Sequence, residues 1–293
     1  MSPAARTDVL LLANPSRQEW HVVRAAAGAA AAFAQPRPGA EASEDSLLVL
    51  PLGQDAAVLA VADGMGGVPG GGEAATRAVT TLGRVVEEGV AAGHTLRSCV
   101  LNGIEQANAA VLEMANGAAT TLAVAELSGG LVRAYNVGDS EVLVVGQRGR
   151  VKLRTVSHSP VGFAVQAGLV DDDEAMHHED RHVVSNFLGS RNMRIEVGSP
   201  VRLAARDTVV VCSDGLADNL RVSEIPPLVC LGDLDAGVAR LGRAASARMA
   251  DAAGDHPSKP DDLSIVAYRP MPGATVLRRL PPPRQLELDH AAG

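Results

Sequence analysis

The sequence predicts an α+β fold in which two antiparallel β-sheets pack face to face, with helices on the outside. Short apolar runs with β character occur early in the chain, again in its middle and at its end, and two long helical patterns separate the first group from the second. The middle runs are joined by links of only a few residues, which predicts an antiparallel meander. A chain of 293 residues is long enough to bury a sizeable core in such a sandwich.

The first half of the chain begins with strands and then becomes helical. Apolar residues at a spacing of three and four predict the two helices, and short apolar runs bounded by turn residues predict the strands. The elements predicted here are strands within 9–13 and 20–34, strands at 46–52 and 56–62, and helices at 73–92 and 95–116.

The second half contains most of the predicted strands. The segment 158–190 looks irregular and partly helical, and we interpret its acidic run Asp171–Glu174 as the first turn of a short helix, not as a patch for a basic partner. Residues 1–270 then form one domain, and 271–293 is a flexible proline-rich tail in which Arg278-Arg279 offers a docking handle. The other predicted elements are strands at 119–126, 131–137, 141–146, 150–155, 206–212 and 263–269, a helical turn after Gly215 and a helix at 234–250.

Composition excludes several classes of protein. The chain is 46% hydrophobic but only 2% aromatic, so its core must be built from Ala, Val and Leu. The formal net charge of −8 argues against nucleic acid or an anionic membrane surface as partner. No apolar run approaches the roughly 20 residues that a membrane helix needs. Cys99, Cys212 and Cys230 are scattered and odd in number, which is typical of reduced core residues in a cytoplasmic protein.

Acidic residues recur where the predicted strands begin or end. Asp63 follows an apolar run and precedes Gly64-Met65-Gly66-Gly67, where glycine lets the backbone turn sharply and approach a ligand closely. Carboxylates gathered at sheet edges repel one another, and the one nearby lysine, Lys259, cannot neutralise the set. Oxygen donors without a His or Cys cluster predict Mg²⁺ or Mn²⁺ and not zinc. The other residues placed in this way are Asp45, Asp139, Asp214, Asp261 and Asp262.

These motifs, taken in order, resemble a known family. SEDS, ADGMGG, TTLAVAEL, YNVGDS, SHS, CSDGLADN and DDLSIV lie between residues 40 and 269 and resemble the metal-dependent protein Ser/Thr phosphatases of the protein phosphatase 2C family, bacterial type. The resemblance implies a β-sandwich of two antiparallel sheets flanked by helices, with a dimetal centre at one end. It also implies hydrolysis of phosphoserine and phosphothreonine on proteins, with phosphoproteins and a Ser/Thr kinase or its targets as partners.

For the first metal ion the resemblance implies ligands from the first two motifs. Asp63 would bridge two Mn²⁺ or Mg²⁺ ions, and the carbonyl of Gly64 would bind one of them. Glu44 and Asp45 would hold one ion, largely through water.

For the second ion the resemblance implies Asp214 and Asp261 as ligands, which makes Asp63, Asp214 and Asp261 the catalytic set. Asp139 and Asp218, together with Asp214, match a third and weaker metal site in the family.

The chemistry of such a site does not require a nucleophilic side chain. A water shared by two divalent ions becomes a nucleophile near neutral pH, and the ions stabilise the charge on a phosphoryl group displaced in line. Cys212 lies inside an apolar run, and Ser140 and Ser213 have no triad context. We interpret the two serine hydroxyls as partners of the local turn backbone.

Several positions depart from the family pattern. Ala40 stands where the family commonly has an Arg that grips the substrate phosphate, and Arg37 is close enough in sequence to take its place. Val68 follows DGMGG where bacterial members commonly have a His, so a general acid is absent there. Glu141 follows GDS in place of an Arg, and Asp262 replaces an Asn and adds a negative charge beside the neighbouring aspartate.

One more departure lies in the SHS motif. His158 lacks the acidic residue that usually precedes it, since Ser157 is there, and we interpret His158 as structural.

Two functions remain open. The leading hypothesis is an active phosphatase that reverses a bacterial Ser/Thr kinase, and the alternative is a low-activity regulatory or phospho-binding module with a phosphatase fold. Ala40 favours the module, whereas the retained aspartates favour the enzyme, because a carboxylate cluster is costly to keep without metal. A purely structural sandwich with accidental aspartate turns conflicts with the ordered set of motifs.

Overall fold

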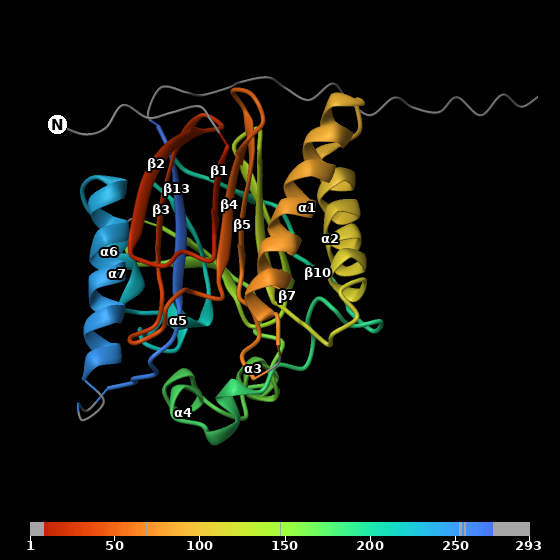
Figure 1. Cartoon of the computed structure of the whole chain (residues 1–293). Helices are drawn as coiled ribbons and strands as arrows, with labels where there is room; N and C mark the ends of the chain where they lie inside the picture. The colour runs from red at the N-terminus through yellow and green to blue at the C-terminus, as the bar shows by residue number, and fades with distance from the viewer. Residues whose placement is uncertain (1–8, 68, 147, 252–253, 255, 272–293) are drawn as a thin grey trace, which may run out of the picture.

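The fold is described from a computed structural model of the chain, in which residues 9–67, 69–146, 148–251, 254 and 256–271 are placed. Two antiparallel sheets pack face to face, and helices cover the outer face of each sheet (Figure 1). The predicted α+β sandwich is therefore confirmed. Within these residues no helix is both long and apolar enough to cross a membrane.

Sheet I comprises β1 (Leu10–Ala13), β4 (Ser46–Pro51), β5 (Ala56–Ala62), β6 (Leu122–Ser128), β7 (Leu131–Val137), β10 (Glu196–Val197) and β11 (Val201–Arg202). Its strands run in the order β1-β4-β5-β6-β7-β10, and β11 also pairs with β7. Helices α1 (Gly71–Ala91) and α2 (Leu96–Leu112) lie side by side along its outer face (Figure 1). Both predicted long helices are thus confirmed.

Sheet II comprises β2 (Glu19–Ala25), β3 (Gly28–Gln35), β8 (Glu141–Val145), β9 (Val151–Arg154), β12 (Thr208–Cys212) and β13 (Leu263–Pro270). The strand order is β2-β3-β13-β12-β8-β9, so the last strand of the sequence lies in the middle of the sheet. Three helices accompany it: α5 (Asp214–Ala217), α6 (Ile225–Val229) and α7 (Leu234–Ala250). Helix α7 packs on β3 and β13 (Figure 1).

The segment between β9 and β10 lies at one end of the sandwich. It contains α3 (Pro160–Gln166), α4 (Asp172–Met176) and the 3₁₀ turn η1 (Glu179–His182), which lie at the same end as α5 (Figure 1). Asp171 caps α4, because its side chain accepts a hydrogen bond from Glu174 N at 2.8 Å and the Glu174 side chain accepts one from Asp171 N at 3.1 Å. The acidic run is therefore a helix start, as predicted.

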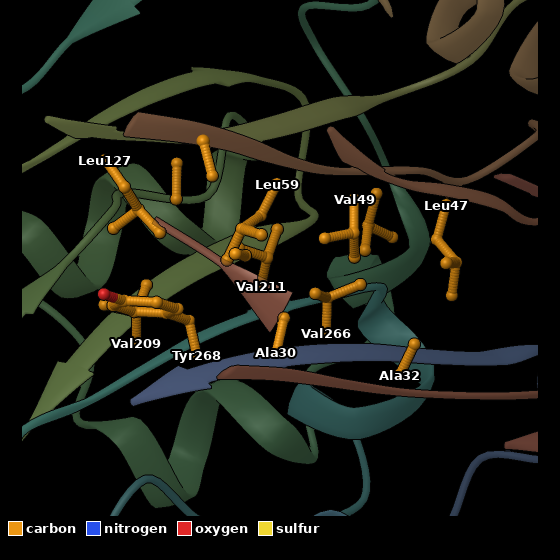
Figure 2. Close-up of a cluster of buried hydrophobic side chains, with 14 of the residues drawn as sticks. Ala30, Ala32, Leu47, Val49, Leu59, Leu127, Val209, Val211, Val266 and Tyr268 are labelled. Carbon is orange, nitrogen blue, oxygen red and sulfur yellow. The ribbon is translucent and has the colours of Figure 1, made fainter. Parts of the chain in front are cut away.

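The core between the two sheets consists mainly of small and branched aliphatic side chains. Inward-facing residues alternate along each strand, since successive side chains of a strand point to opposite faces. The composition-based expectation of an Ala, Val and Leu core is confirmed. Figure 2 shows Leu47, Val49, Leu59 and Leu127 of sheet I against Ala30, Ala32, Val209, Val211, Val266 and Tyr268 of sheet II.

Residues 20–34, predicted as strand material, form two paired strands. The chain reverses between them at Ala26-Ala27, where Ala26 takes a left-handed φ of 46°. Alanine rarely occupies that conformation, which usually favours glycine or asparagine. The turn is therefore not visible in the residue types.

The runs between 119 and 155 do not form one meander. Strands β6 and β7 pair in sheet I, whereas β8 and β9 belong to sheet II, so the chain crosses between the sheets at Gly138-Asp139-Ser140. Gly138 has a φ of 111°, and a Cβ atom there would lie 2.6 Å from Thr121 Cβ. The short link therefore redirects the chain and leaves Asp139 where the two sheets meet.

The remaining boundaries agree with the predicted ranges to within a few residues. Helix α2 ends at Leu112, before the predicted 116, and Ala115 and Gly117 follow with left-handed φ values of 53° and 80°. Cys99, Cys212 and Cys230 are buried and form no disulfide. Val68 and the tail residues 272–293, with Arg278-Arg279, lie outside the described residues.

Candidate active site

Six carboxylates lie together at the end of the sandwich where α3, α4 and α5 are found. They come from five separate segments of the chain, which the crossing and pairing of the strands bring to one place. Five of the aspartates lie where the strand-edge pattern predicted them, and the sixth, Asp218, was expected only from the family resemblance. They are Asp45 before β4, Asp63 after β5, Asp139 between β7 and β8, Asp214 and Asp218 at α5, and Asp261 before β13.

The backbone around Asp63 is held by the TT of the TTLAVAEL motif. Asp63 N donates to Thr121 Oγ1 at 3.0 Å, and Asp63 O accepts from Thr120 Oγ1 at 2.8 Å and from Thr121 N at 2.9 Å. At Gly64 a Cβ atom would lie 2.4 Å from the carbonyl carbon of Gly71, so only glycine fits against the start of α1. The motif was recognised from the sequence, but its role in fixing Asp63 was not.

Two serine hydroxyls form hydrogen bonds that position the carboxylates, not bonds within their own turns. Ser213 Oγ donates to Asp45 Oδ2 at 2.8 Å and accepts from Ser264 N at 3.0 Å. Ser140 Oγ lies 2.6 Å from Thr121 Oγ1, so it supports the threonine that holds Asp63. The interpretation that both hydroxyls bond only local backbone is wrong, because each partner is distant in sequence.

Lys259 lies among three of the carboxylates. Its Nζ contacts Asp214 Oδ2, and it is 2.8 Å from Asp218 Oδ2 and 3.0 Å from Asp261 Oδ2. The sequence showed that Lys259 is near the motif, but a pairing with all three aspartates requires the fold. These four side chains are only 14–24% exposed, so the pairs are partly shielded from water and still reachable from it.

The cluster as a whole is short of positive charge. Burial, followed by repulsion from Asp45 and Asp214, holds the pKa of Asp63 well above its usual range. Burial and the charge of Asp214 raise the pKa of Asp139 to about 8. For Asp214 burial acts in the same upward direction, but the Lys259 ammonium outweighs it and the pKa of Asp214 lies below its ordinary value. Among the described residues, the Lys259 ammonium thus pairs with three of the six carboxylates, and further cations would stabilise the group.

The donor set fits divalent cations of the Mg²⁺ and Mn²⁺ type. All the donors are oxygens, and Oδ1 of Asp45 and Oδ1 of Asp214 are buried without a hydrogen-bond partner among the described residues. Within the same residues, no three carboxylate, imidazole or thiolate groups already converge as metal ligands do. The ammonium of Lys259 is the cation that three of them face.

A cavity of about 210 Å³ opens beside the carboxylates. Asp139, Asp214 and Asp218 line one side of it, and residues of the β9–α4 segment, including Ser157 and Gln166, line the other. The cavity gives a small group direct access to the aspartates, as a substrate site requires.

Comparison with known proteins gives the family. The sequence pattern described as Protein phosphatase 2C matches residues 40–250, which is most of the chain. This chain belongs to the protein phosphatase 2C family. Its relatives in that family include named phosphatases, which are hydrolases.

Two relatives and two solved structures illustrate the likeness. Serine/threonine phosphatase stp of Listeria welshimeri is 28% identical over 181 residues, covering 59% of this chain and 71% of that protein. A putative protein phosphatase 2C-type of Streptococcus pyogenes is 31% identical over 173 residues, covering 56% and 69%. The phosphatase MsPP of Mycobacterium smegmatis, solved with cacodylate, is 26% identical with a TM-score of 0.67, covering 82% and 97%. The catalytic domain of the phosphatase PstP, solved with 2 manganese ions, has the same fold at 19% identity and a TM-score of 0.66, covering 89% and 99%.

The departures from the family pattern have structural partners. Asp262 accepts hydrogen bonds from Arg37 N at 2.7 Å and from Glu44 N at 2.8 Å, one on each carboxylate oxygen. It therefore ties the loop around Ala40 to the end of the sheet. The Arg37 side chain points to Glu44, with Nη1 3.8 Å from Oε2, and it is 48% exposed, so it is free to reach toward a ligand.

The other two departures stabilise the wall of the cavity. Glu141, which is 3% exposed, pairs with Arg154 at 2.8 Å, and Arg154 reaches Asp172 of α4 at 2.7 Å. His158 Nδ1 accepts from Gly138 N at 3.1 Å, and its Nε2 lies 2.9 Å from Glu196. His158 thereby braces the crossover beside the carboxylates, in agreement with a structural role.

Proposed function

We propose that this chain is a metal-dependent phosphatase that hydrolyses phosphoserine and phosphothreonine on proteins. The observation that carries the proposal is the group of six aspartates beside an open cavity, with two buried carboxylate oxygens that lack partners among the described residues. Membership of the protein phosphatase 2C family supports the reaction, and relatives named serine/threonine phosphatase support the substrate class.

The aspartates would divide the metal ions between them. Asp63 would bridge two ions, with the Gly64 carbonyl, Glu44 and Asp45 on one side and Asp214 and Asp261 on the other. When bound, Mn²⁺ or Mg²⁺ would supply a nucleophilic water and neutralise charge on the phosphoryl group. The chain's own part is to fix the donors, since Thr121 holds Asp63 and Ser213 holds Asp45. A third ion at Asp139, Asp214 and Asp218 is the weaker expectation of the family pattern.

Arg37 would bind the substrate phosphate in place of the arginine that Ala40 replaces. Its guanidinium is beside Glu44 and exposed, and the carboxylate of Asp262 fixes its backbone. A guanidinium suits this role because it pairs with two phosphate oxygens at once. The substrates we expect are proteins phosphorylated by a Ser/Thr kinase, and this enzyme would reverse that phosphorylation.

The test is hydrolysis of an aryl phosphate and of a phosphothreonine peptide by chelator-treated protein. We expect turnover only after Mn²⁺ or Mg²⁺ is added, and no inhibition by reagents directed at cysteine nucleophiles. Asp55→Asn is a matched control, since Asp55 is exposed and precedes the strand that Asp63 follows. Full activity in excess chelator would contradict the proposal, whereas Mn²⁺ binding without turnover would identify the regulatory module instead.

A further inference from the structure

The ammonium of Lys259 provides positive charge to one half of the carboxylate cluster, formed by Asp214, Asp218 and Asp261. It contacts Asp214 and lies within hydrogen-bonding distance of Asp218 and Asp261. Two of these residues, Asp214 and Asp218, also belong to the set that the family pattern gives to the third ion. The chain therefore brings its own positive charge to that position.

The backbone fixes Lys259 independently of the ion pairs. Lys259 N donates to Asn219 Oδ1 at 2.9 Å, and Lys259 O accepts from Asn219 Nδ2 at 2.9 Å. Asn219 is completely buried, and its Nδ2 also donates to Gly215 O of α5 at 2.9 Å. Because Asn219 directly follows Asp218, one segment provides a carboxylate and also positions the lysine that neutralises it.

The residue type suits this position. Of the 26 basic residues in the chain, only Lys152 and Lys259 are lysines, and all the others are arginines. An ammonium is a compact point charge with donors in several directions, whereas a planar guanidinium pairs side-on with one or two carboxylates. The three N–H donors of an ammonium suit three aspartates grouped around one point.

We propose that Lys259 is a built-in cation that takes the place of the third divalent ion at Asp214 and Asp218, so that the chain binds two ions. This inference rests on the proposed function, since it concerns the ions of the same site. Its consequence is that removal of the ammonium should open a metal site that the parent protein does not offer.

The test counts the Mn²⁺ bound to each chain by equilibrium dialysis, from chelator-stripped protein up to millimolar Mn²⁺. We expect Lys259→Met to bind about one ion more than the parent, because the freed carboxylate oxygens suit a hard divalent cation. Lys152→Met is the control. Lys152 lies on β9 and pairs with Asp207, which directly precedes β12, so this ion pair is outside the cluster. An ion count for Lys259→Met that equals or falls below that of the parent would overturn the inference.

A double variant shows whether the gained ion uses the proposed ligands. Lys259→Met/Asp218→Asn removes the ammonium and one carboxylate together, so we expect it to lose the extra ion. Retention of the extra ion would overturn the assignment to Asp218. If Lys259→Met does not fold without metal, Lys259→Gln is counted in the same way, since its amide still donates to one carboxylate.

The ion count and the reaction are measured separately. A parent protein that binds Mn²⁺ but does not hydrolyse a phosphothreonine peptide would contradict the proposed function and leave the count comparison intact. A parent that hydrolyses the peptide while Lys259→Met gains no ion would contradict only the role of Lys259.

Discussion

The two halves of the aspartate cluster, Asp45 with Asp63 and Asp214 with Asp218 and Asp261, differ in whether a cation among the described residues pairs with them. In one half, Asp45 and Asp63 form no ion pair with any residue that the structure describes, and burial raises the pKa of both. In the other half, the ammonium of Lys259 overcomes the effect of burial on Asp214 and lowers its pKa. A single lysine thus reverses the shift at Asp214, whereas burial and the charge of Asp214 still raise the pKa values of Asp218 and Asp261 to about 6.

The largest effect is expected for Asp63→Asn, which keeps the side chain's size but removes the charge shared between two ions. Turnover should fall by on the order of 10²–10³-fold or more, as when a group that stabilises the transition state is removed. In chelator the variant should be as stable as the parent or more so, since it no longer buries a repelled carboxylate. Its Mn²⁺-induced gain in Tm should shrink. An equal gain in both proteins would show that Asp63 is not a ligand.

Asp214→Asn should have the opposite effect on the metal-free protein. The substitution takes a partner from the Lys259 ammonium, which keeps Asp218 and Asp261, so we expect a loss of about 1–3 kcal/mol. Urea unfolding in chelator measures the loss, with Asp63→Asn beside it. If both substitutions shifted stability in the same direction, the electrostatic difference between the halves would be disproved.

Arg37→Ala tests the loop around Ala40, which lies beside the half of the cluster that contains Asp45 and Asp63. Loss of a charge-assisted bond of about 1.5–3 kcal/mol should raise KM for small phosphate esters and weaken inhibition by free phosphate. Arg84→Ala is the control, because Arg84 pairs with Glu88 along α1. Unchanged kinetics in Arg37→Ala would make the arginine a bystander.

The smallest effect is expected for Asp262→Asn. Asn has one carbonyl oxygen and one NH₂ donor in place of the two carboxylate oxygens, so one of the two backbone N–H groups, of Arg37 or Glu44, would lose its acceptor. KM should rise by less than in Arg37→Ala, and the double variant should be no worse than Arg37→Ala alone. Additive effects in the double variant would show that Asp262 acts on something other than Arg37.

Periodicity and turn residues predicted the fold class because each strand and each helix is itself a local segment of the sequence. The helix over 234–250 and the strand over 56–62 agree with α7 and β5 residue for residue. The meander prediction failed because Gly138–Ser140 is a short link that changes sheets. The turn at Ala26-Ala27 contains no typical turn residue, so the pattern over 20–34 did not show where its two strands divide.

The candidate site was predicted as a set of residue types but not as a set of contacts. The aspartates could be found because each lies beside an apolar run. The partners of Asp45 and Asp63, which are Ser213 and Thr121, lie more than 50 residues away in sequence, as the 168- and 58-residue separations show. Only the strand pairing brings such residues together, so no local pattern identifies them.

The position of β13 determines when this protein can become active during its own synthesis. Strand β13 pairs with β3 on one side and with β12 on the other, so sheet II stays in two pieces until the ribosome has released nearly the last described residues. Lys259 and Asp261 emerge just ahead of that strand. The cation, one of its carboxylates and the strand that joins the sheet therefore arrive together, and a nascent chain lacking them has neither a finished fold nor a finished site. Such late, non-local closure also makes folding slow in comparison with a helical protein of equal size.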